Sequence, residues 1–166
     1  MSRKRGNEES MTERREFIKS AVLGAAAALP GVAQDRTLRV GFIGTGNRGS
    51  QLLKPVLKFP WARVTAVCDV DEATAAKGRD QVQTAGQPAP AVFTGSKEAY
   101  RQLVERTDVD AVIIATPWDW HVPMALAAMK AGKAVGIEVP AAQSVEDCWH
   151  LLETRDTTGS PCMMLE

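Results

Sequence analysis

The chain has 166 residues, enough for one domain of ordinary size and a short extension. Hydrophobic residues make up 45% and charged residues 24%, the balance of a globular protein rather than of a disordered or fibrous one. Lys and Arg total 20, as do Asp and Glu, so the formal net charge is zero. This balance excludes general attraction to nucleic acid or to an anionic membrane surface as the basis of function.

Residues 1–33 have the organisation of an export signal peptide. A basic stretch contains the pair Arg14-Arg15, an apolar run follows at 21–29, and small residues up to Ala33 provide a cleavage site. The apolar run is shorter than the roughly 20 residues of a membrane span, so we expect no stable membrane anchor. The paired arginines resemble a twin-arginine signal, which directs folded bacterial proteins out of the cytoplasm. This predicts the twin-arginine export machinery as a partner and a periplasmic or secreted location; the alternative is an ordinary amphipathic N-terminal helix.

From residue 36 onward, short apolar runs alternate with helical segments, which predicts an α/β domain. Strands are expected at 38–44, 64–70, 91–94, 109–115, 134–139 and 162–165. Helices are expected at 47–58, 72–84, 97–106, 121–131 and 145–158, with Ser96 and Ser144 as N-caps and Gly132 and Gly159 at two ends. The predicted fold is a Rossmann domain over residues 36–166, a doubly wound parallel sheet of about six strands.

The chain stops at Glu166, on the sixth predicted strand. A dinucleotide fold with no following domain has little to hold a substrate against its cofactor. We therefore expect a truncated product that lacks a C-terminal α+β substrate domain and exposes a surface meant for it.

The three cysteines, Cys68, Cys148 and Cys162, are too few for a disulfide framework and are not spaced as zinc ligands. We expect all three to be buried thiols and predict no metal site. Cys148 belongs to a helical segment in which Val145, Trp149 and Leu152 also follow the 3.6-residue period of an amphipathic helix.

A glycine-rich loop follows the first predicted strand directly and opens the first predicted helix. Its sequence, Gly44-Thr45-Gly46-Asn47-Arg48-Gly49, fits the G-x-G-x-x-G pattern, which is typical of dinucleotide binding in this strand–loop–helix context. Gly44 permits the tight turn, Gly46 lets the backbone approach a pyrophosphate, and Gly49 allows close helix–strand contact. The helix N-terminus would face the phosphates, with the Asn47 and Arg48 side chains within reach of phosphate or ribose.

Asp69 lies 20 residues after Gly49, at the end of the second predicted strand. This is the expected place for a carboxylate that accepts the ribose hydroxyls of NAD. Asp71 and Glu72 add negative charge without an arginine, which would repel a 2′-phosphate and favours NAD over NADP. The alternative, a strand-end Asp that only caps the next helix, fits Asp71 better than Asp69.

Two further segments follow strands at their carboxyl ends, where open α/β sheets bind ligands. After the fourth strand, Thr116 would face the cofactor, while His121 and the two tryptophans of this segment either contribute to the site or only cap and pack. After the fifth, Glu138 would place a carboxylate beside the nicotinamide, and a site role is favoured because a charge there needs a partner. The candidate residues of the two segments are Thr116, Trp118, Asp119, Trp120, His121, Glu138 and Val139.

On these residues the chain resembles the Gfo/Idh/MocA superfamily. Its N-terminal Rossmann domains carry the glycine loop, an Ala-Thr-Pro-x-x-x-His segment (here 115–121) and a Glu-Lys-Pro. This chain departs from the last pattern, because Val139 occupies the lysine position. In the dehydrogenase members that lysine serves the hydride-transfer site, so the departure disfavours a simple sugar or inositol dehydrogenase.

The valine at position 139 points to one branch of this superfamily. Gly-Asn-Arg-Gly, Ala-Thr-Pro-Trp, His-Val-Pro-Met-Ala, Gly-Ile-Glu-Val-Pro and Pro-Cys-Met-Met-Leu-Glu together resemble glycoside hydrolase family 109, over residues 38–166. These enzymes are NAD-dependent α-N-acetylgalactosaminidases, several with twin-arginine signals. The resemblance implies NAD contacts at Asn47, Arg48, Asp69, Trp118 to His121, Glu138 and Val139.

The resemblance also implies a redox-neutral reaction on a glycan that ends in α-N-acetylgalactosamine. The sugar is oxidised at C3, loses the C2 proton and the glycosidic group, gains water, and is reduced again, without the pair of flanking carboxylates of ordinary glycosidases. The catalytic acid and base are expected beyond Glu166. Because free NAD is scarce outside the cell, export implies a retained cofactor. The alternatives are an NAD-dependent sugar or inositol oxidoreductase and a non-catalytic NAD-binding module, which would describe the isolated chain. Whether the protein is a homo-oligomer stays open.

Overall fold

The computed structural model describes residues 37–165, and the predicted signal peptide over residues 1–33 lies outside them. None of the helices in this range is long and apolar enough to cross a bilayer. The elements, in chain order, are β1 (Leu38–Ile43), α2 (Asn47–Val56), β2 (Ala62–Cys68), α3 (Glu72–Thr84), β3 (Ala91–Phe93), α4 (Tyr100–Val104), β4 (Ala111–Ile114), the 3-10 helix η1 (Trp118–Trp120), α5 (His121–Lys130), β5 (Ala134–Ile137), α6 (Val145–Thr158) and β6 (Cys162–Met164).

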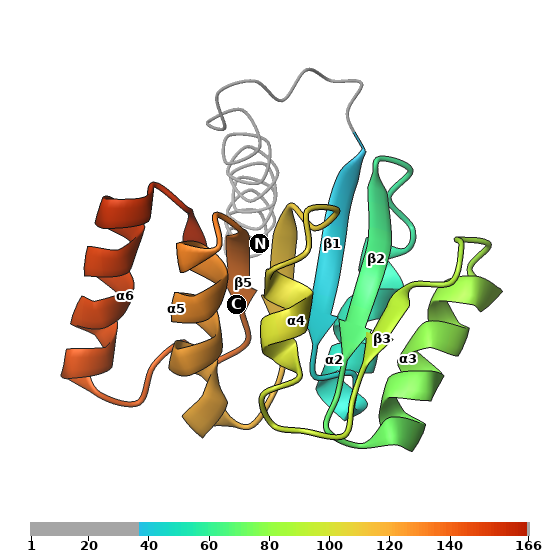
Figure 1. The fold of residues 1–166 in the computed structure, drawn as a ribbon, viewed down its shortest axis with the longest axis horizontal. Helices are drawn as coiled ribbons and strands as arrows, with labels where there is room; N and C mark the ends of the chain where they lie inside the picture. Colours follow the sequence, from blue (N-terminus) through green and yellow to red (C-terminus); the bar gives the residue numbers. More distant parts are fainter. Residues whose placement is uncertain (1–36, 166) are drawn as a thin grey trace, which may run out of the picture. The chain divides into compact units, whose positions relative to one another are not determined.

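The strands form one parallel sheet with the order β3-β2-β1-β4-β5-β6 (Figure 1). β1 lies in the centre, with Val40 opposite Val64 of β2 on one side and opposite Ala111 of β4 on the other. The strand order changes direction between β1 and β4, and ligands of open α/β sheets bind at this switch point. The predicted α/β Rossmann fold with a six-stranded parallel sheet is confirmed.

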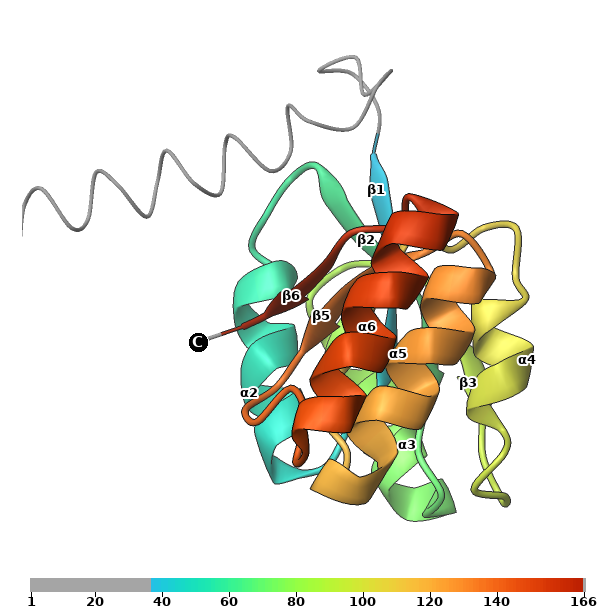
Figure 2. The same cartoon turned by 90° about the vertical axis from the view of Figure 1, so that its left-hand side faces the viewer.

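Helices cover both faces of the sheet, which explains why its central strands are almost continuously apolar. Figures 1 and 2 show α4, α5 and α6 on one face and α2 on the other, where α3 packs on β2 and β3. Each face has its own core of fully buried side chains. On the first, Tyr100, Leu103 and Met129 meet the sheet; on the second, Leu53 and Val82 do.

Most predicted element ends lie within two residues of the observed ones, but the helix expected over 97–106 starts too early. α4 begins at Tyr100. Ser96 does accept a hydrogen bond from the Glu98 N–H through its hydroxyl. The backbone that follows, however, uses bonds from Ala99 N to Ser96 O and from Arg101 N to Glu98 O, which span three residues instead of four. The segment after Ser96 is therefore a tight turn.

Helix α6 lies at the surface and corrects the expectation that its cysteine is buried. Ser144 caps this helix as predicted, by accepting from the Asp147 N–H, and Gly159 ends it with a φ of +70°. Yet the apolar positions stay exposed, at 75% for Val145 and 59% for Trp149. α6 packs on α5 and has no buried residue. The expectation that all three cysteines are buried is wrong, because Cys148 on α6 is exposed and Cys162 on the edge strand β6 is half-buried.

Candidate functional site

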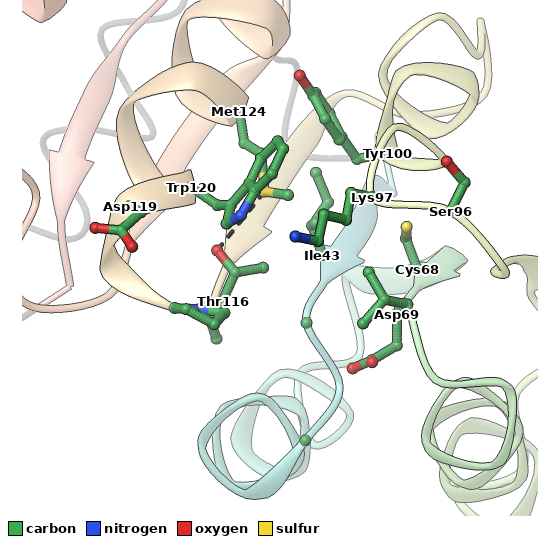
Figure 3. Close-up of a pocket in the computed structure, with 15 residues that line it drawn as sticks. Ile43, Cys68, Asp69, Ser96, Lys97, Tyr100, Thr116, Asp119, Trp120 and Met124 are labelled. Atoms are coloured by element: carbon green, nitrogen blue, oxygen red, sulfur yellow. Dashed lines mark hydrogen bonds between the residues drawn. The ribbon is translucent and has the colours of Figure 1, made fainter.

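A cavity of about 340 Å³ opens at the carboxyl end of the sheet, beside the switch point (Figure 3). Its size falls within the range of small-molecule sites. The strand-end segments after β1, β2, β3 and β4 all contribute, together with α5. The lining residues are Ile43, Gly44, Gly46, Cys68, Asp69, Val70, Ser96, Lys97, Tyr100, Ala115, Thr116, Pro117, Asp119, Trp120 and Met124.

The glycine loop forms one wall of the cavity, and each of its glycines meets a different requirement. Gly44 has a φ of +84°, and a Cβ there would lie 2.5 Å from the Ala115 carbonyl oxygen. A Cβ on Gly49 would lie only 1.9 Å from the Gly44 carbonyl oxygen, whereas a Cβ on Gly46 would meet nothing within 4 Å. Gly44 and Gly49 thus allow the backbone to fold tightly, and Gly46 leaves the approach from outside open.

The loop also presents the N-terminus of α2. The first N–H bonded within this turn is that of Ser50, which donates to Gly46 O. The N–H groups at positions 47 to 49 precede that bond and have no acceptor within the helix. They carry the partial positive charge of the helix N-terminus, a setting that suits phosphate groups.

Asp69 is fixed against the glycine loop from the end of β2. Its Oδ2 accepts from the Thr45 N–H at 2.8 Å, and its Oδ1 accepts from the Asp71 N–H at 3.1 Å. The carboxylate lines the cavity and has remaining lone pairs for further donors such as sugar hydroxyls. Asp71, in contrast, caps α3 by accepting from the Thr74 N–H at 2.7 Å. The structure thus assigns the capping role to Asp71.

Glu138 and Arg48 form a bidentate ion pair across the carboxyl end of the sheet. Arg48 Nε lies 2.9 Å from Glu138 Oε2, and Nη2 lies 2.8 Å from Oε1. The side chain of Glu138 is 11% exposed. The hydrogen-bonded Arg48 guanidinium holds the pKa of the Glu138 carboxyl below its usual range. The charge at the end of β5 therefore has the partner that its burial requires, and the pair joins the glycine loop to this strand end.

The segment after β4 divides between the cavity and the interior. Thr116 lines the cavity and its hydroxyl contacts the Met124 sulfur at 3.6 Å. Trp120 also lines it, with its ring edge-on to Tyr100 at a centroid distance of 6.3 Å. Trp118, however, is exposed outside the cavity. His121 is 1% exposed and does not line it.

The cavity lining includes six of the thirteen predicted site residues: Gly44, Gly46, Asp69, Thr116, Asp119 and Trp120. The others lie outside that lining: Asn47, Arg48 and Gly49 at the start of α2, Trp118 and His121 after β4, and Glu138 and Val139 after β5. The proposed NAD contacts of all thirteen residues stay predictions.

Sequence reasoning missed the segment after β3. Ser96, Lys97 and Tyr100 line the cavity, and Figure 3 shows the Lys97 side chain directed into it. The sequence pattern predicted a regular helix over 97–106 with Ser96 as its N-cap, and no site role was predicted for these residues. Because β3 is a parallel strand, its carboxyl end lies on the same edge as the other candidates, and this signal could have identified them.

The cavity holds one thiol, that of Cys68, and burial beside Asp69 raises its pKa to about 12. It stays protonated at neutral pH and is not a nucleophile there. Among residues 37–165, no group of three or more His, Cys, Asp or Glu side chains could hold a metal ion. The chemistry that this edge of the sheet supports is the binding of a ligand with phosphates and a sugar.

Comparison with known proteins agrees with that geometry. The sequence model of a family described as Gfo/Idh/MocA, an oxidoreductase family with an NAD-binding Rossmann fold, matches residues 38–165. A protein of Stenotrophomonas maltophilia named glycosyl hydrolase family 109 protein is 42% identical over 160 residues, with 93% of this chain and 35% of the relative covered. A protein of the same name from Saccharopolyspora erythraea is 44% identical over 130 residues, with 78% of this chain and 28% of the relative covered.

Solved structures share the fold. The WlbA dehydrogenase of Chromobacterium violaceum, in complex with NADH and UDP-GlcNAcA, superposes with a TM-score of 0.70 at 22% identity and covers 80% of this chain and 36% of its own. An NAD-binding protein from Listeria innocua superposes with a TM-score of 0.63 at 25% identity, and the match covers 78% of this chain and 35% of the Listeria chain. The chain spans 28% to 39% of the length of the curated relatives that it matches.

Proposed function

The chain belongs to the Gfo/Idh/MocA oxidoreductase family, with its NAD-binding Rossmann fold, and from that premise we propose that it is the NAD-binding part of an exported glycosidase. The proposed substrate is a glycan with a terminal α-N-acetylgalactosamine. The observation that carries the NAD half of this proposal is the glycine loop with the fixed Asp69 carboxylate beside it. The glycosidase half is supported by relatives named glycosyl hydrolase family 109 at 38% to 44% identity.

The residues at the carboxyl edge fit a dinucleotide. Open space at Gly46 lets a pyrophosphate reach the N–H groups at the start of α2. Asp69 is positioned to accept from ribose hydroxyls, and it lies beside Asp71 at the same strand end. A 2′-phosphate would meet this pair of carboxylates, so NAD is the form that fits.

The proposed reaction leaves the sugar with no net oxidation. When bound, NAD supplies reversible hydride transfer to and from the sugar, which permits elimination and addition of water in between. In this scheme the chain's own residues bind and orient: the glycine loop holds the diphosphate and Asp69 holds a ribose. The Arg48–Glu138 pair fixes the end of β5 relative to the glycine loop, so that the nicotinamide half would meet a rigid wall.

Val139 separates this proposal from the second candidate, an NAD-dependent sugar or inositol oxidoreductase. The family is described as an oxidoreductase family, which favours the second candidate. The dehydrogenase pattern Glu-Lys-Pro, however, has valine here, and a valine side chain can neither hydrogen-bond nor exchange a proton. Glu138-Val139-Pro140 therefore favours the glycosidase over net oxidation of a sugar.

The test uses a protein of the relatives' length that contains this chain, with 4-nitrophenyl α-N-acetylgalactosaminide as the probe. We expect 4-nitrophenol release without accumulation of reduced cofactor, loss of release after NAD is stripped, and recovery when NAD is restored. Accumulation of reduced cofactor with N-acetylgalactosamine or inositol would instead support the oxidoreductase. Absence of release from folded, NAD-loaded protein would refute the glycosidase proposal and leave NAD binding intact.

Export belongs to the same proposal. The Arg14-Arg15 pair supports transport through the twin-arginine machinery to a periplasmic or secreted location, with NAD bound before transport. A redox-neutral reaction suits this location because the cofactor never has to exchange. Export of protein that carries bound NAD would support this, and purification of the exported protein without NAD would contradict it.

A further inference from the structure

A second cavity, of about 510 Å³, lies at the amino edge of the sheet, opposite the strand ends that carry the glycine loop (Figure 1). Its walls come from the starts of β1 and β2, from the loop before β3 and from the turn between α4 and β4. Three arginines line it: Arg39, Arg63 and Arg106. The cavity shares no residue with the proposed NAD site, and its lining is far more basic.

Two of the arginines are held by bidentate pairs with aspartates. Arg39 Nε and Nη2 lie 2.9 and 2.6 Å from the two carboxylate oxygens of Asp110. Arg106 Nε and Nη2 each lie 2.7 Å from a carboxylate oxygen of Asp108. In both pairs the carboxylate occupies one edge of the planar guanidinium, which leaves the Nη1 donors for another acceptor. The pairs therefore fix two sets of donors in place without using all of them.

The charge of the third arginine, Arg63, has no partner among the described residues. Its side chain makes no hydrogen bond or ion pair with any residue between 37 and 165. Its register partner on the neighbouring strand is Arg39, so two like charges start from adjacent backbone positions and repel each other. Among the three arginines and the two paired aspartates, one positive charge is uncompensated. An anion in the cavity would compensate it.

The cavity walls are fixed by hydrogen bonds of the protein itself. Lys133, which is 9% exposed, donates from Nζ to the Arg106 carbonyl oxygen at 2.6 Å. The Thr65 hydroxyl donates to the Asp108 carbonyl oxygen at 2.8 Å. On the opposite wall, Gln87 Oε1 accepts from a backbone N–H of β2 at 2.9 Å. Because these walls need little further ordering, a small ligand would bind at a low entropic cost.

We propose that this cavity binds a single phosphate group, either free or carried by a small organic molecule. Guanidinium groups bind phosphate through parallel N–H···O bonds, and three of them from three segments suit its several oxygens better than the two of a carboxylate. A phosphate monoester carries a charge of about −1.5 to −2 at pH 7, which suits one uncompensated arginine beside two paired ones. A polyanion such as nucleic acid would meet too little excess charge. This site is independent of the proposed function.

The first measurement is ¹H–¹⁵N NMR of the full chain, titrated with inorganic phosphate and with glycerol 3-phosphate at saturating NAD. NAD keeps phosphate from the N-terminus of α2; if NAD does not bind, the amides at 47–49 report that place separately, so failure of the proposed function leaves this test intact. We expect shifts of the Arg39 and Arg63 Nε–H signals and of the Ala89 and Ala91 amides. Shifts confined to α2, or the same shifts with acetate or with sodium chloride at equal ionic strength, would overturn the proposal.

The second measurement compares two variants that each remove one positive charge. Arg63→Gln leaves no carboxylate unpaired, whereas the control Arg155→Gln changes an exposed position on α6 outside the cavity. We expect phosphate affinity to fall about tenfold or more in Arg63→Gln, the factor for one lost hydrogen bond to a charged group, and to be unchanged in Arg155→Gln. Phosphate should accordingly raise the Tm of the wild type and of Arg155→Gln more than that of Arg63→Gln.

Wild-type phosphate affinity in Arg63→Gln, or an equal loss in both variants, would overturn the proposal. If Arg63→Gln does not fold, the shifts mapped on the wild type still decide. Tighter binding of glycerol 3-phosphate than of inorganic phosphate would support the site and identify an organic phosphate as its ligand class. The reverse order would support the site and identify free phosphate.

Discussion

Alanine substitutions at Gly46 and Gly49 separate two functions of the same loop. At Gly49 the added methyl would lie 1.9 Å from the Gly44 carbonyl oxygen, against a lower limit of 3.0 Å for real contacts. The loop or the start of α2 must therefore shift by about 1 Å. Because the obstacle is backbone and cannot rotate away, the cost is at the upper end for overpacking, about 3 kcal/mol. For a domain of this size that lowers the melting temperature by about 10 °C.

At Gly46 the same methyl meets nothing within 4 Å, and the backbone φ of −61° is open to alanine. We expect Gly46→Ala to change the free energy of unfolding by less than about 1 kcal/mol. The methyl does, however, fill the space through which a diphosphate reaches the α2 N–H groups. Loss of one hydrogen bond to a charged group corresponds to about 1.5–3 kcal/mol, or a roughly 10- to 150-fold weaker NAD affinity.

Circular dichroism melts and NAD titration calorimetry on both variants decide the matter. Gly46→Ala should melt with the wild type and bind NAD weakly, while Gly49→Ala should melt early. Wild-type NAD affinity in Gly46→Ala would refute the assignment of this loop to the diphosphate. An unchanged melting temperature for Gly49→Ala would refute the steric argument itself.

Further predictions concern the two carboxylates and the export signal. Asp69→Asn keeps an acceptor for the Thr45 N–H but loses the charge and turns a donor toward the Asp71 N–H, so calorimetry should show NAD affinity at least about tenfold weaker, with a loss of stability of about 1–3 kcal/mol from the Asp71 contact; equal affinity would contradict the ribose assignment. Because the folded state lowers the pKa of Glu138, the ionised carboxylate stabilises the fold at pH values above the ordinary carboxyl range. This stabilisation is lost as the pH falls through the lowered pKa. Glu138→Gln should therefore reduce the loss of stability in acid, measured by urea unfolding between about pH 3 and pH 7, and an unchanged acid dependence would dismiss the pair as its source. Lysines at positions 14 and 15 should block export, assayed by cell fractionation, and continued export would exclude the twin-arginine route.

The fold followed from the sequence because its signals are local. Strand β4 is a short apolar run, and the α3 helix is marked by its Asp71 cap, so its observed bounds match those expected. The glycine loop was recognisable because its strand, turn and helix are adjacent in the chain. These features need only neighbouring residues to form, and a single sequence contains that information.

The misses depend on packing that the sequence pattern does not encode. The partner of Glu138 is 90 residues away at Arg48, and only the pairing of β1 with β4 and of β4 with β5 brings them together. The apolar period of α6 predicted an apolar face, but the periodicity did not reveal that Val145 and Trp149 would stay exposed. Lys97 was predicted to lie in a helix, but it lies in a turn, and its side chain points into the cavity.

The central position of β1 in the sheet determines which parts of the domain can form early in folding and which form late. β1 is the first described strand, yet its second ladder forms with β4, where Val40 pairs with Ala111. Closing so long a stretch of chain is slow compared with local helix formation. The cavity proposed to bind NAD takes Asp69 from the end of β2 and Thr116 from the end of β4, so a nascent chain has no complete cavity until the long-range ladder has closed. On the proposed assignment, NAD would stabilise only molecules that have passed this slow step, and its binding would draw the folding equilibrium to the native side.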